Sequence, residues 1–157
     1  MNNATGGAKV QLSGTKILLV EDCPDQQRLL YHYLRNAQAD VALECNGEAA
    51  VDSVAKASQK GTQFDAVVMD LVLQQMDGIC ATEQILRISP AVAVVGLTAN
   101  GSDAVETAWR RAGCIAYLTK PVTKDALTKV LAEGISMMRI DNEIRRGLIA
   151  SRPLTEL

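Results

Sequence analysis

Short, wholly apolar runs alternate along this chain with longer segments of helical periodicity. Residues that are apolar on consecutive positions are typical of strands covered on both faces, as in a parallel sheet. The segment with Val41 and Leu43 alternating gives the weakest of these signals. The runs together predict five strands, at about 16–20, 40–44, 64–70, 91–97 and 115–118.

A helix is expected after each strand, because apolar residues recur there at helical spacing. Pro24 suits the first position of the first helix, since its missing N–H costs nothing there. The expected helices are 24–36, Gly47 to the polar stretch 58–63, 78–88, 103–112, and about Thr123 to at least Met138. Five strands alternating with five helices predict an α/β fold, doubly wound around a five-stranded parallel sheet.

The two ends of the chain differ from this pattern. Residues 1–14 are rich in Gly, Asn and small polar side chains and predict a flexible leader before a domain at 15–138. Residues 139–157 predict a C-terminal helical extension or tail, because Ile140, Ile144 and Leu148 follow one another at i, i+4 and i+8. This stripe either extends the fifth helix or adds a separate one. It could serve dimerisation or pack back on the domain.

Composition excludes several classes of function. A length of 157 residues fits one domain, and a net charge of −2 gives no basic field for nucleic acid. No apolar run reaches the ~20 residues that a bilayer needs, so we expect no membrane span, and no secretion signal begins the chain. The four cysteines show no CxxC spacing and the only histidine is His32, a poor set for zinc. Reduced thiols in a cytoplasmic protein are therefore expected.

Charged residues follow three of the predicted strands. Glu21 and Asp22 come after the first strand, Asp70 ends the third, and Lys120 follows the fifth. Because the carboxyl ends of parallel strands lie along one edge of a sheet, these side chains are expected in one cleft. Three acids at one point repel each other unless a cation intervenes, which predicts a hard metal ion.

Four sequence motifs now carry a family resemblance. The chain resembles the receiver domains of bacterial two-component signalling, including those attached to hybrid histidine kinases. This resemblance implies a flavodoxin-like sheet in the strand order 2-1-3-4-5. The motifs are ILLVED (17–22), VVMDLVLQQMDG (67–78), GLTAN (96–100) and AYLTKP (116–121).

The resemblance also assigns expected roles. Asp70 is the expected phosphoacceptor, taking a phosphoryl group from a phosphohistidine. Mg²⁺ is the expected cofactor, with Asp22 and Asp70 as direct ligands, Glu21 acting through water, and the backbone carbonyl of Val72 as a further ligand. Lys120 is expected to pair with Asp70 and later with a phosphoryl oxygen.

A switch set follows from the same resemblance. The hydroxyl of Thr98 is expected to donate to the phosphate, and the ring of Tyr117 to rotate inward as the threonine moves. The Lys120–Pro121 peptide bond is expected to be cis. The complete expected phosphate-binding and switch set is Thr98, Ala99, Lys120 and Tyr117.

Expected partners are a histidine kinase or a histidine phosphotransfer protein, with a possible homodimer through the tail or through the face of the fourth helix, fifth strand and fifth helix.

Gln74 stands where the family usually has proline, which changes the loop but not the chemistry. Trp109 is interpreted either as a surface reporter or partner contact, or as a packing residue.

The expected function is a signalling switch with slow autodephosphorylation and no turnover of an external substrate. Three other functions are alternatives to it. A Mg²⁺-dependent phosphatase would need a general acid where Val72 stands. A phosphorylation-independent docking module would not need the complete acidic and basic set. A flavin-binding protein would need a Ser/Thr/Gly-rich phosphate loop after the first strand.

Overall fold

Five parallel strands form one sheet in the order β2-β1-β3-β4-β5 in the computed structural model, which describes residues 9–74 and 76–147. The strands are β1 (Lys16–Val20), β2 (Asp40–Glu44), β3 (Ala66–Asp70), β4 (Ala93–Thr98) and β5 (Ala116–Thr119). The helices are α1 (Pro24–Asn36), α2 (Gly47–Gln59), α3 (Gly78–Ile88), α4 (Asp103–Ala112) and α5 (Lys124–Arg145). The predicted α/β class and strand order are confirmed.

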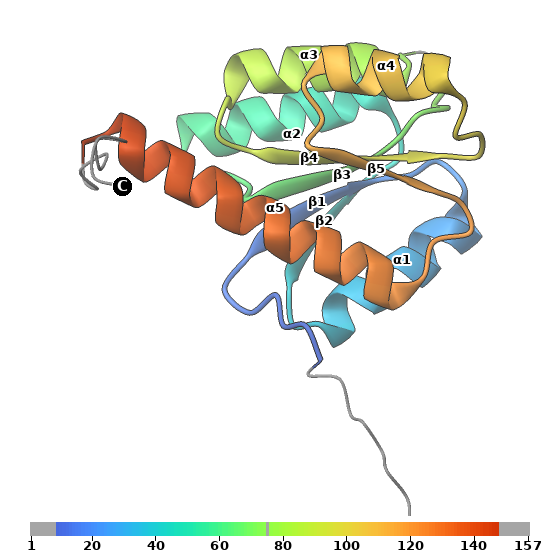
Figure 1. The fold of residues 1–157 in the computed structure, drawn as a ribbon, viewed down its shortest axis with the longest axis horizontal. Coiled ribbons are helices and arrows are strands. Elements are labelled where there is room, and N and C mark those ends of the chain that lie inside the picture. The colour runs from blue at the N-terminus through green and yellow to red at the C-terminus, as the bar shows by residue number, and fades with distance from the viewer. Residues whose placement is uncertain (1–8, 75, 148–157) are drawn as a thin grey trace, which may run out of the picture.

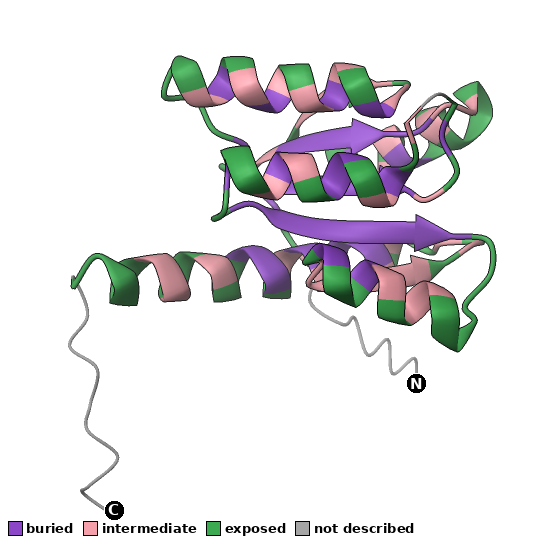
Figure 2. Ribbon diagram, turned by 90° about the horizontal axis from the view of Figure 1, so that it is seen from above, coloured by how far each residue is buried: buried purple, intermediate pink, exposed green. Residues whose placement is uncertain are grey.

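Helices cover both faces of the sheet. α1 and α5 lie on one face, and α2, α3 and α4 lie on the other (Figure 1). Successive residues of a strand enter opposite cores: Val68 of β3 packs with α1 and α5, whereas Val67 packs with α2, α3 and α4. β3 and β4 are therefore buried at every residue, which explains why the sequence shows uninterrupted apolar runs there, and buried stretches of the sheet are visible in Figure 2.

Three strands begin or end later than the sequence predicts. β3 begins at Ala66 rather than at residue 64, and Phe64 is buried in the preceding loop. β4 and β5 each extend to a threonine, because Thr98 pairs with Thr119 and the amide of Lys120 donates to the Thr98 carbonyl at 2.7 Å. As a result, Lys120 follows directly on the last residue of the sheet.

The fifth helix continues without a break to Arg145, so residues 139–145 extend it rather than form a separate helix. Its C-terminal part projects past the sheet (Figure 2). Ile140 and Ile144 are 52% and 44% exposed, so the described part of the stripe does not pack back on the domain. Leu148 lies outside the described residues. Although α5 has 22 residues, neither it nor any other helix in the described ranges is both long and apolar enough to cross a bilayer.

Residues 1–8 of the predicted leader also lie outside the described residues. Leu12, within that predicted leader, is 2% exposed, and its amide donates to the carbonyl of Ala37 at 2.7 Å. Contacts with the domain therefore begin at Leu12 or earlier.

Trp109 is a packing residue and not a surface reporter. It is 1% exposed on α4, and its indole ring lies against Gly96 of β4. A Cβ atom at Gly96 would approach the ring to 2.7 Å, so only glycine leaves room for this contact. The tryptophan thereby fixes α4 on the sheet beside the end of β4.

Candidate functional site

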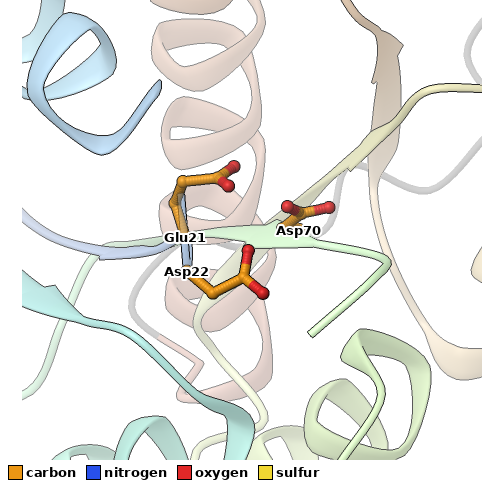
Figure 3. A group of neighbouring side chains, drawn as sticks. All are labelled: Glu21, Asp22 and Asp70. Atoms are coloured by element: carbon orange, nitrogen blue, oxygen red, sulfur yellow. The ribbon is translucent and has the colours of Figure 1, made fainter. Parts of the chain in front are cut away.

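Three carboxylates meet at the edge of the sheet where β1 and β3 end. β1 and β3 are adjacent and in register, with Val20 opposite Met69, so the residues after Val20 lie beside Asp70. One carboxylate oxygen each of Glu21, Asp22 and Asp70 lies within 4.8 Å of the others. Figure 3 shows the three side chains directed toward the same space from two chain segments. The structure thus brings together the acids that the sequence placed at separate strand ends.

Lys120 reaches the same cluster from the other side of β4. Its Nζ lies 2.9 Å from Oδ2 of Asp70 and 3.1 Å from Oε2 of Glu21. The lysine side chain is 19% exposed, so its ammonium faces the acids with little solvent around it. One ammonium therefore bridges two carboxylates that come from different strands.

Asp70 has hydrogen bonds on both carboxylate oxygens. Oδ2 accepts from Lys120, and Oδ1 accepts from the backbone amide of Val72 at 3.1 Å. The residue is 5% exposed, whereas Val72 is 70% exposed. These contacts fix the orientation of the Asp70 carboxylate while the valine side chain points to solvent.

Glu21 is the most deeply buried acid of the cluster, at 1% exposed. Its carboxylate accepts from Lys120 and from the amide of Cys23 at 3.1 Å. Burial raises the pKa of Glu21 from its ordinary value of 4.5 to about 7; the bond from Lys120 opposes this rise and the charge of Asp70 adds to it. Burial alone would lower the pKa of Lys120, but its bonds to Asp70 and Glu21 raise it. The cluster therefore has more negative charge than its lysine balances.

The donor set suits a hard divalent cation. Carboxylate oxygens are the ligands that Mg²⁺ prefers, and this ion usually keeps several waters in its shell. Asp22 is only half-buried, which leaves solvent access on that side of the cluster. Burial, with a smaller contribution from the charge of Asp70, raises the pKa of Glu21, and a bound cation would favour its ionised form. These residues can hold a metal ion.

The expected switch residues lie nearby but do not contact Asp70. The hydroxyl of Thr98 donates to the carbonyl of Asn100 at 2.8 Å and accepts from the Asn100 amide at 3.1 Å. The hydroxyl of Tyr117 donates to Oε2 of Glu106 at 3.2 Å. Desolvation and this carboxylate raise the pKa of Tyr117. Both hydroxyl groups are thus directed to partners outside the acidic cluster.

The two remaining expected residues lie in the loops that frame the cluster. Ala99 is exposed at the start of the loop after β4. The Lys120–Pro121 peptide bond is cis.

Sequence reasoning missed Gln27 and Glu106. Nε2 of Gln27 donates to the backbone carbonyls of Glu21 at 3.1 Å and Glu44 at 3.3 Å, which ties α1 to the ends of β1 and β2. Both residues sit on helices as ordinary polar side chains. The carbonyls bound by Gln27 and the Tyr117 hydroxyl bound by Glu106 lie on or beside neighbouring strands rather than on the same helix, so no local pattern distinguishes the two residues.

An open groove of about 380 Å³ adjoins the cluster between α1 and the segment that follows β5. Leu29 of α1 borders it and is 50% exposed. Lys120 is shared by the groove and the acidic cluster. A partner bound in the groove would therefore lie next to Asp70.

Without a metal ion, the free energy of unfolding should fall as the pH rises from 4.5 to about 7. Over this range Glu21 stays protonated in the folded protein but has lost its proton in the unfolded chain. The stability that is present below pH 4.5 is therefore lost as the pH rises to about 7. Each unit of raised pKa corresponds to about 1.4 kcal/mol. Urea unfolding in EDTA, followed by Trp109 fluorescence, measures the effect. In Glu21→Gln this part of the pH dependence should disappear; an identical slope in both proteins would contradict the assignment to Glu21.

A family model described as the response regulator receiver domain matches residues 17–132. The transcriptional regulatory protein ZraR of Salmonella typhimurium is 34% identical over 125 residues, which cover 78% of this chain and 27% of ZraR. The osmosensing histidine protein kinase SLN1 of Saccharomyces cerevisiae is 28% identical over 123 residues, 77% of this chain and 10% of SLN1. The chain therefore spans only a minor part of these curated relatives.

A solved structure agrees with this match. The receiver domain of the sensor histidine kinase PA1611 from Pseudomonas aeruginosa, with a magnesium ion coordinated in its active-site cleft, has a TM-score of 0.71 and 32% identity. The alignment covers 79% of this chain and 99% of that one. The chemotaxis protein CheY4 of Vibrio cholerae, at 23% identity and a TM-score of 0.68, shows the shared fold alone. The chain belongs to the family of response regulator receiver domains.

Proposed function

We propose that Asp70 accepts a phosphoryl group from a phosphohistidine and that the modification changes a protein-interaction face of this receiver. One observation carries the proposal: the Asp70 carboxylate is buried, is hydrogen-bonded to Lys120, and lies within 4.8 Å of the Glu21 and Asp22 carboxylates. A structural aspartate at a strand end would need none of these neighbours.

The chain's own residues supply the nucleophile and part of the charge compensation. A carboxylate oxygen of Asp70 forms a bond to phosphorus, the P–N bond to the donor imidazole breaks, and the imidazole takes up a proton. Val72 and Lys120 hold the carboxylate in one orientation before the reaction. Lys120, which already lies 2.9 Å from Asp70, then compensates charge on the transferred group.

Glu21, Asp22, Asp70 and the backbone carbonyl of Val72 would hold Mg²⁺. The close approach of the three carboxylates and the raised pKa of Glu21 support this assignment. When bound, the ion supplies positive charge that offsets the oxygens of the phosphoryl group. In this set Asp22 and Asp70 would bind the ion directly, and Glu21, which accepts hydrogen bonds from Lys120 and the Cys23 amide, would act through a water molecule.

Output would pass through Thr98, Ala99 and Tyr117 to the face formed by α4, β5 and α5. Thr98 and Tyr117 have hydroxyl groups that can change partners, and they lie on the adjacent strands β4 and β5. Phosphorylation adds nearly two negative charges, which gives Thr98 a new acceptor. The same face, or the exposed part of α5, is where a second copy of the chain would bind.

The donor would be a histidine kinase or a histidine phosphotransfer protein, and the groove beside Lys120 gives it a route to Asp70. The four free cysteines agree with a reducing, cytoplasmic location. The net charge of −2 disfavours nucleic acid as a partner.

A signalling role is favoured over the alternatives. At the position of the general acid that a phosphatase would need, Val72 has no ionisable group and its side chain is 70% exposed. Slow loss of the phosphoryl group to water is expected, without turnover of another substrate. The contacts of Lys120 with both Glu21 and Asp70 disfavour a docking module that works without phosphorylation.

Incubation with acetyl phosphate and Mg²⁺, followed by intact mass measurement, tests the proposal. The wild-type protein should gain the mass of one phosphoryl group, and the gain should disappear in EDTA. Asp70→Asn should abolish it, because an amide is not a nucleophile toward phosphorus and cannot form an acyl phosphate.

Asp52→Asn is the matched control, since Asp52 is an exposed acid of α2 that does not belong to the cluster of Glu21, Asp22 and Asp70. It should be phosphorylated as the wild-type protein is. No mass gain in the wild-type protein, or an equal gain in Asp70→Asn, would refute the proposed function.

A further inference from the structure

Glu106 of α4 has two partners on opposite sides of its carboxylate. One oxygen contacts the guanidinium of Arg110, one turn further along the helix. The other oxygen, Oε2, accepts the hydroxyl hydrogen of Tyr117 at 3.2 Å. The glutamate therefore links α4 to the edge strand β5 through the residue expected to move when Asp70 is phosphorylated.

Tyr117 occupies a defined place in the sheet. It lies opposite Gly96 in the pairing of β4 with β5, and Thr98 follows two residues later on β4. Its ring packs with the core that includes Trp109, on the face covered by α4. Gly96 is therefore in contact with Trp109 and paired with Tyr117, so the indole lies close to the tyrosine's position.

We propose that Glu106 is a positioning residue that holds Tyr117 against α4 and thereby opposes the phosphorylated state. This inference rests on the proposed function. Movement of Tyr117 toward Thr98 would break its bond to Glu106, and the ionised acceptor makes that bond stronger than one between neutral groups. Thr98 is held in a similar way by its two bonds to Asn100, so the unmodified state has partners for both hydroxyl groups.

Removing the Glu106 contact should favour binding of a phosphoryl analogue. A ligand that binds one of two states gains apparent affinity when the competing state is destabilised. Glu106→Ala should therefore bind beryllofluoride, in the presence of Mg²⁺, about three- to tenfold more tightly than the wild-type protein. Trp109 fluorescence follows the titration, because its ring contacts Gly96, the β4 residue paired with Tyr117.

Tyr117→Phe removes the same hydrogen bond from the other side and keeps the ring. It should raise the affinity by a similar factor. The double variant with Glu106→Ala should show little further gain, because both changes remove one interaction. A general loosening of α4 would not produce this non-additivity. Tyr117→Phe also decides the question if Glu106→Ala does not fold.

Glu83→Ala makes the same substitution on an exposed position of α3 and should stay within about twofold of wild type. Glu106→Gln keeps a neutral acceptor and should lie between the wild-type protein and Glu106→Ala. Unchanged affinity in both Glu106→Ala and Tyr117→Phe, or additive effects in the double variant, would overturn the inference. Absence of beryllofluoride binding by the wild-type protein would instead refute the proposed function.

Discussion

Lys120→Met should lose about 3–5 kcal/mol of unfolding free energy at pH 8 in EDTA, as expected when one partner of a buried ion pair is removed. The side chain of methionine has a similar length, so the change removes mainly the ammonium. Glu21 and Asp70 are 1% and 5% exposed, and in the variant they stay buried close to each other without the ammonium of Lys120 between them. Their repulsion and desolvation are the source of the cost.

The loss should be smaller at pH 5, where Glu21, whose pKa is already about 7 with the lysine present, is protonated in the folded protein. The variant's stability should consequently fall more steeply between pH 5 and 8 than that of the wild-type protein. In the wild-type protein the bonds to Asp70 and Glu21 raise the pKa of Lys120, so the lysine keeps its charge throughout this pH range. Urea unfolding at the two pH values measures both slopes.

Lys129→Met is the matched control, because Lys129 is exposed on α5. It should change stability by no more than about 0.5 kcal/mol. Added Mg²⁺ should restore part of the stability of Lys120→Met, since a bound ion supplies the missing positive charge. Equal stability of Lys120→Met and the wild-type protein at pH 8 would show that the ammonium does not compensate the buried acids.

The sequence was sufficient for the positions of the charged groups because strand ends are a strong local signal. The buried run before Asp70 is apolar on every residue, and the first polar position marks the edge of the sheet. The parallel arrangement then requires Glu21 and Asp22 to lie beside Asp70. Convergence of these acids could therefore be predicted from the order of strands alone.

Contacts between a helix and a strand could not be predicted in this way. The bond from Tyr117 to Glu106 depends on how α4 is rotated on the sheet, and that rotation is fixed by Trp109 against Gly96. A tryptophan followed by two arginines on an amphipathic helix gives no local sign of which partner it meets. The predicted β4 ends one residue too early for a related reason: Thr98 belongs to the strand through its pairing with Thr119.

Gly78→Ala should disturb the site more than its small size suggests. Gly78 begins α3, and its amide donates to the carbonyl of Leu71 at 3.0 Å. A Cβ atom there would lie 2.0 Å from the backbone oxygen of Asp70 and 3.1 Å from Cα of Leu71. Because these are backbone atoms, no side-chain rotation relieves the overlap, and the segment that holds Asp70 must shift.

We expect Gly78→Ala to lower the free energy of unfolding by about 3 kcal/mol, the upper end for overpacking. The rate of phosphorylation by acetyl phosphate should fall up to about 100-fold, because a displacement near 1 Å at a reacting group has effects of that size. Urea unfolding and time-resolved intact mass measure the two quantities separately.

Gly61→Ala separates stability from site geometry. Gly61 has φ +69°, and no atom lies within 4 Å of the position a Cβ would take, so alanine there adds backbone strain without overlap. It follows α2, away from the strand ends that carry the acids. This control should lose about 1–2 kcal/mol and keep the wild-type phosphorylation rate. If Gly78→Ala also lost stability but kept its phosphorylation rate, Gly78 would serve the stability of the fold and not the placement of Asp70. A loss of rate in Gly78→Ala alone would instead tie the start of α3 to the position of the phosphoacceptor.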